Sequence, residues 1–80
     1  MDKRMLEDHL AETMRHVRLG ERHVVRQLQI IEELERDGHI ETAAQAKRLL
    51  RDFEELLTLS IADRDRLLAE LREPNKEADH

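Results

Sequence analysis

The most regular chemically active side chains of this 80-residue chain are three histidines spaced by seven residues: His9, His16 and His23. On a helix this spacing gives one column with about 10 Å between neighbours. One metal ion needs ligands within a few ångströms of each other, which favours spacings of three or four residues. We therefore interpret the column as imidazoles that cover the edge of an apolar core. Metal binding and pH sensing are the alternatives.

Two shorter groups come closer to the spacing of metal ligands. His9, Glu12 and His16 share one helical face, and Glu77 with His80 forms a Glu-x-x-His pair. Carboxylate-bridged di-metal bundles carry such pairs on their helices, but this pair falls in the polar C-terminal segment. The sequence predicts no metal site and no cofactor.

A basic strip lies on the same stretch of chain: Arg15, Arg18, Arg22 and Arg26. It could bind phosphate or an acidic partner. However, the net charge is −5, and there is no Trp or Tyr to stack on bases, so nucleic-acid binding is the less favoured interpretation. We expect these arginines to pair with acidic side chains of a neighbouring helix or of a dimer mate, the candidates being Glu54, Glu55, Asp63 and Asp65.

Alternating charges at Asp63-Arg64-Asp65-Arg66 interrupt an apolar pattern. They could fix helix register through interhelical pairs, or they could simply be solvated. No nucleophile–base arrangement, glycine-rich loop or convergent polar pocket can be identified in the chain. We therefore predict that the protein is not an enzyme.

Helical periodicity must position these groups. One apolar column is spaced by sevens, and a less pure companion column runs beside it: Leu10, Val17, Val24 and Ile31, then Leu6, Thr13, Gly20, Gln27 and Leu34. This period predicts a helix over about residues 3–37. The following glycine, Gly38, predicts a turn over 38–41. A capping-box pattern at Thr42 to Gln45 predicts a second helix over about 42–72, with His39 as the alternative cap. The polar segment 74–80 is expected to be a disordered tail.

A connection this short makes the two helices antiparallel. With the turn centred near residue 40, Gly20 should lie near Ser60 and Val24 near Leu56. Glycine within a helix costs about 1 kcal/mol relative to alanine. Gly20 could therefore allow close backbone approach, leave room for a side chain from a second subunit, or be a tolerated local defect.

Composition limits the class of protein. Charged residues make up 41% of the chain, and Gly, Pro and aromatic residues are rare, as is typical of long helices or coiled coil. There is no cysteine, no apolar signal region and no run of membrane-spanning length. We expect a soluble, cytoplasmic protein.

The apolar stripes are wider than a single seam between two helices can cover. We therefore predict an all-α hairpin, residues 1–73, that dimerises into a four-helix bundle or coiled coil. The candidate interface residues are Leu10, Val17, Val24, Leu28, Ile31, Leu49, Phe53, Leu56 and Leu57. The predicted function is a non-enzymatic protein-interaction module. The alternatives are a small regulator that contacts nucleic acid through the Arg15–Arg26 strip and a weak metal- or ligand-binding bundle.

Several segments also carry a resemblance. Gly20 to Val24, the turn around Gly38-His39, and the stretches Leu49 to Glu54 and Ile61 to Leu67 resemble a group of short, uncharacterised helical proteins common in soil-dwelling alphaproteobacteria. The resemblance covers about residues 15–72 and rests on helix and turn residues. It implies a bacterial cytosolic source and a two-helix unit, and it implies no activity.

Overall fold

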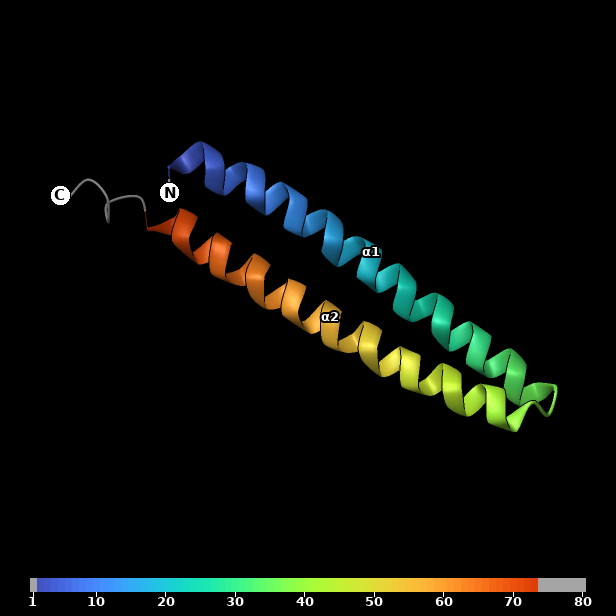
Figure 1. Ribbon diagram of the computed structural model, residues 1–80. Helices are drawn as coiled ribbons and strands as arrows, with labels where there is room; N and C mark the ends of the chain where they lie inside the picture. Colours follow the sequence, from blue (N-terminus) through green and yellow to red (C-terminus); the bar gives the residue numbers. More distant parts are fainter. Residues whose placement is uncertain (1, 74–80) are drawn as a thin grey trace.

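Two long helices form an antiparallel hairpin in the computed structural model, which describes residues 2–73 (Figure 1). Helix α1 spans Lys3–Arg36 and helix α2 spans Ile40–Arg72. They lie side by side over their whole length, roughly 50 Å at the usual rise per residue (Figure 1). This arrangement confirms the predicted all-helical hairpin. The expected tail, 74–80, lies outside the described residues.

Both ends of α1 are capped by local chemistry. At the start, the Asp2 carboxylate accepts a hydrogen bond of 2.9 Å from the Met5 amide, which satisfies one of the free N–H groups of the first turn. At the end, Gly38 adopts a φ of 78°, which a residue without a Cβ reaches at little cost. The Gly38 and His39 amides donate to the carbonyls of Glu35 and Leu34, a Schellman motif that closes the helix.

Helix α2 begins two residues earlier than the sequence indicated. Its N-cap position is His39, which makes no side-chain capping bond, and its first helical residue is Ile40. Thr42 lies inside the first turn, so the predicted capping box at Thr42 and Gln45 was wrong and the alternative cap position was right. The cause is the Schellman motif, which completes the reversal by His39 and lets α2 start at once.

The core is one narrow seam between the helices. Buried side chains on both helices are separated by three or four residues, or by sums of threes and fours. From α1 they are Leu6, Thr13, Val17, Gln27 and Ile31, and from α2 they are Ala43, Ala46 and Leu67. The impure column of α1 therefore faces the seam. Its polar member Gln27 is accommodated because its Nε2 donates a hydrogen bond of 2.9 Å to the Ala46 carbonyl.

The register differs from the expected pairing. A Cβ placed on Gly20 would lie 3.1 Å from Leu57 Cδ1 and 3.8 Å from Leu57 Cα, so Gly20 faces Leu57 and not Ser60. The expected pairs were three residues out because the chain reverses around Gly38 and His39 rather than around residue 40. Of the three explanations for Gly20, the geometry supports close approach within the hairpin.

Candidate interaction surfaces

The hairpin has two broad sides, and contacts between the helices identify the residues on each. On one side, the His23 and Phe53 rings lie 5.2 Å apart between centroids. On the other side, Lys47 Nζ lies 2.9 Å from Glu35 Oε2. Residues at heptad spacing from these contacts share the same side. We call the two sides the histidine face and the ion-pair face.

The histidine face combines the imidazole column with exposed aliphatic side chains. Its members are His16, Leu19, His23 and Ile30 from α1, and Leu49, Phe53, Leu56 and Leu59 from α2. Leu56 and Leu59 are 61% and 67% exposed, and Leu49 is 45% exposed. We call the columns directly beside the seam the inner columns; on this face they are His16, His23 and Ile30 on α1 and Leu49 and Leu56 on α2. They carry no Asp, Glu, Lys or Arg over residues 16–30 of α1 and 49–56 of α2. This side is a charge-poor apolar surface with imidazoles along one border.

The ion-pair face is also partly apolar, but acidic side chains divide it. Its inner columns are Met14, Glu21, Leu28 and Glu35 on α1, and Lys47, Glu54, Ile61 and Leu68 on α2. Leu28 is 51% exposed and Met14 is 39% exposed. Glu21 and Glu54 stand between the apolar positions, so any covering surface would have to solvate or pair these carboxylates.

The nine candidate interface residues fall into three groups. Val17 and Ile31 are only 4% and 5% exposed, because α2 already covers them. Leu10, Val24, Phe53 and Leu57 are half-buried along the seam. Leu28, Leu49 and Leu56 are exposed, the first on the ion-pair face and the other two on the histidine face. Only the exposed group is fully available to another chain.

Leu19 and Leu59 were not among the candidate residues, yet both are about half exposed or more on the histidine face. Leu19 lies three residues after His16, and Leu59 lies three after Leu56. That spacing to residues beside the seam is the sequence signal that could have identified them.

The arginine strip is exposed and unpaired within the hairpin. Arg15, Arg18, Arg22 and Arg26 all lie on the outer side of α1, turned away from α2. Across residues 2–73, no ion pair within 4.0 Å involves any of them. The expected pairing with acidic residues of the antiparallel helix was therefore wrong, because the arginines face outward while Glu54 and Asp63 lie beside the seam. Pairing with a dimer mate stays a prediction.

The alternating charges near the end of α2 pair within their own helix. Arg66 lies 2.7 Å from Asp63 and 3.0 Å from Glu70, and Arg64 lies 3.0 Å from Asp65. The hydrogen bond from Arg66 is the main reason that the pKa of Asp63 lies below its usual value, partly opposed by desolvation. The positive charges of Arg66 and His9 act in the same direction as the hydrogen bond. The same hydrogen bond raises the pKa of Arg66. These ion pairs stabilise α2 locally and do not join the two helices.

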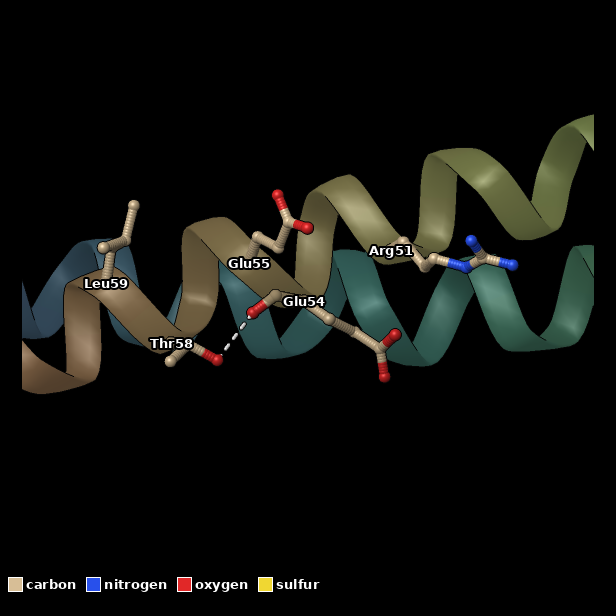
Figure 2. Close-up of a pocket in the computed structure, with 5 residues that line it drawn as sticks. All are labelled: Arg51, Glu54, Glu55, Thr58 and Leu59. Atoms are coloured by element: carbon tan, nitrogen blue, oxygen red, sulfur yellow. Dashed lines mark hydrogen bonds between the residues drawn. The ribbon is translucent and has the colours of Figure 1, made fainter.

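Over residues 2–73, the histidines and carboxylates form no metal cluster, and the hollow on α2 is open. Within the described part of the chain, no three His, Asp or Glu side chains lie close enough together to hold a metal ion; Glu77 and His80 lie outside it. His16 and Glu12 are 4.0 Å apart, but no third ligand joins them. Figure 2 shows an open hollow on α2 lined by Arg51, Glu54, Glu55, Thr58 and Leu59, with α1 passing behind. All its lining residues come from one helix, and the Thr58 hydroxyl is already bonded to the Glu54 carbonyl at 2.9 Å.

Comparison of the chain with protein-family models, with curated proteins and with solved structures found no match. Neither α1 nor α2 contains a stretch that is both long and apolar enough to span a bilayer.

Proposed function

We propose that this chain is a non-enzymatic protein-interaction module that works as a homodimeric helical bundle. The observation that carries the proposal is the amount of apolar surface that the hairpin leaves uncovered. Among residues 2–73, nine large hydrophobic side chains are between 39% and 75% exposed: Met5, Met14, Leu19, Val25, Leu28, Ile40, Leu49, Leu56 and Leu59. Four of these side chains, Leu19, Leu49, Leu56 and Leu59, lie on the histidine face, and soluble proteins seldom expose contiguous apolar surface unless it is a binding surface.

The thin core supports the same proposal. Among the described residues, Leu67 is the one large side chain below 2% exposure, and two of the six buried apolar residues are alanines. A core this small contributes little against the conformational entropy of two long helices. A partner that covers one broad side adds a second seam to each helix and gives the four-helix bundle that such hairpins form.

A second copy is the simplest partner. In a two-fold symmetric dimer both chains use the same surface, so one apolar side of the hairpin is covered by the same side of the second copy. The charged outer surfaces then remain available for a further protein, with specificity set by complementary charges. The absence of cysteine and the sequence resemblance favour the cytosol of a bacterium as the setting.

Energy transfer between labelled copies tests this proposal. The chain contains no cysteine, so Glu55→Cys, on the outer side of α2, gives one labelling site. We expect mixing donor- and acceptor-labelled chains at micromolar concentration to produce energy transfer, and excess unlabelled chain to remove it. Helical chains that show no transfer would overturn the homodimer and indicate a different partner for the apolar surface.

The unpaired arginine strip favours a second candidate function, contact with a nucleic-acid backbone. Four arginines on one helical face, free of ion pairs within the hairpin, are available to bind phosphates. Duplex DNA binding followed by fluorescence anisotropy should then weaken steeply between about 50 mM and about 200 mM salt. Arg15→Ala with Arg22→Ala should reduce both the affinity and the salt slope, and Arg48→Ala, on α2, should change neither. The absence of binding at low salt would end this candidate.

A further inference from the structure

We propose that the histidine face is the surface on which the second copy sits, and that acidification separates the two chains by charging imidazoles there. This inference rests on the proposed function: it identifies the surface used by the homodimer and the condition that regulates it.

The distribution of charge distinguishes the two sides of the hairpin. Covering the ion-pair face would desolvate Glu21 and Glu54, which have no ion-pair partner among residues 2–73. Removing an unpaired carboxylate from water is strongly unfavourable. The inner columns of the histidine face present only uncharged side chains between residues 16–30 and 49–56. The histidine face can therefore be buried with much less loss of hydration.

The position of this surface suits a second copy. Phe53, His23 and Leu56 lie near the middle of the hairpin length, with Leu49 towards the turn and His16 towards the open end. A two-fold axis through this region brings each apolar cluster against its equivalent. Aromatic and aliphatic side chains then form the centre of the contact. The bordering charges, Arg26 of α1 and Asp52 of α2, are opposite in sign and can pair across the rim.

Imidazole chemistry makes this contact sensitive to pH. His23 packs against the Phe53 ring, and no carboxylate lies within 4.0 Å of it in the described chain. The charged groups bordering it are Arg26 on its own helix and Asp52 on α2, one of each sign. Burial between two chains disfavours the charged imidazole. The separate chains therefore bind more protons, and lowering the pH through about 6.5, where histidine ordinarily titrates, favours separation.

The other two histidines of the column, His9 and His16, have different surroundings. His16 lies 4.0 Å from Glu12. His9 lies at the open end, close enough to Asp63 for its charge to act on that carboxyl. A charged imidazole beside a carboxylate is tolerated. His23 is thus the member of the column whose protonation most opposes assembly, and His9 is its matched control.

Two pairs of variants test the inference by sedimentation equilibrium of the full chain. At pH 7.5, Leu56→Asp on the histidine face should raise the dimer Kd about 100-fold or more, because it buries an unpaired carboxylate. Leu28 is similarly exposed on the ion-pair face. Leu28→Asp should change the dimer Kd by no more than a few-fold. The opposite order would overturn the assignment of the surface. If the wild-type chain forms no dimer at pH 7.5, the proposed function itself fails.

The pH arm uses the same measurement. We expect the wild-type Kd to rise about tenfold or more between about pH 7.5 and pH 5.5, since each histidine that is neutral in the dimer contributes up to roughly one order of magnitude. His23→Gln should remove most of this rise, and His9→Gln should retain it. A dimer whose Kd is unchanged over this range, or whose pH dependence survives His23→Gln, would overturn the inference and leave the homodimer intact. Circular dichroism on each sample shows whether helicity is retained.

Discussion

Gly20 offers the sharpest test of how the two helices pack. Replacing it with alanine removes the conformational freedom of glycine, which favours the helix by about 1 kcal/mol. The added Cβ would lie 3.1 Å from Leu57 Cδ1, closer than an ordinary contact, but 3.5 Å from Leu57 Cβ. Leu57 is half-buried and its terminal methyl can withdraw, at a cost of about 0.5 kcal/mol for a small departure from its rotamer. We expect Gly20→Ala to raise the free energy of unfolding by about 0.5 kcal/mol.

Urea unfolding followed by circular dichroism, at one fixed protein concentration, measures this change. Ala62→Gly, on the exposed outer side of α2, is the matched control because it reports helix propensity without a contact across the seam. Gly20→Leu should destabilise the hairpin by about 2 kcal/mol through overpacking against Leu57. If Gly20→Leu is tolerated, the close approach of Gly20 to Leu57 is refuted. If Gly20→Ala destabilises by more than about 1 kcal/mol, the Leu57 methyl does not withdraw as expected.

Three further predictions follow from named contacts. Gln27→Leu should change the free energy of unfolding by less than about 1 kcal/mol, because it removes both the hydrogen bond to Ala46 and the need to bury an amide. Gln27→Ala should lower the free energy of unfolding by about 2 kcal/mol. Equal losses of stability for the two variants in urea unfolding would contradict this prediction. Val24→Asp places an unpaired carboxylate in the seam, so helical circular dichroism at micromolar concentration should be largely lost, and a folded variant would show that this seam is not essential. Because the folded-state pKa of Asp63 is lowered below 3.8, its contribution to stability is present above about pH 4 and is lost as the pH falls through the lowered value. The difference in stability between wild type and Asp63→Asn should thus shrink as the pH falls below about pH 4, and a difference that stays constant or grows below about pH 4 would contradict the Arg66 interaction.

The architecture could be predicted from the sequence because heptad periodicity indicates which face of each helix is buried. The start of α1 at Lys3 and the left-handed turn at Gly38 followed from the same local rules. The start of α2 did not. Thr42 and Gln45 match a capping box, but hydrogen bonds from Gly38 and His39 complete the reversal earlier, and sequence spacing does not rank two plausible caps.

Register and exposure were harder to predict for a related reason. Shifting α2 by three residues exchanges one seam column for the other, so the same periodicity fits both pairings of Gly20. Leu56 was expected in the seam opposite Val24, but the seam uses the column of Leu50 and Leu57, so Leu56 is 61% exposed. It could not be known from spacing alone that the arginines of α1 turn away from α2. The surface assignment thus depends on the contacts of His23 with Phe53 and of Lys47 with Glu35.

The homodimer is best tested by sedimentation equilibrium of the untagged chain near pH 7.5, over a concentration series from nanomolar to micromolar. We expect a reversible monomer–dimer equilibrium that reaches twice the 9.5 kDa chain mass at micromolar concentration. Circular dichroism on the same samples should show helicity rising with the dimer, because folding and assembly are coupled. A fully helical species of 9.5 kDa that persists across the series would contradict the homodimeric bundle.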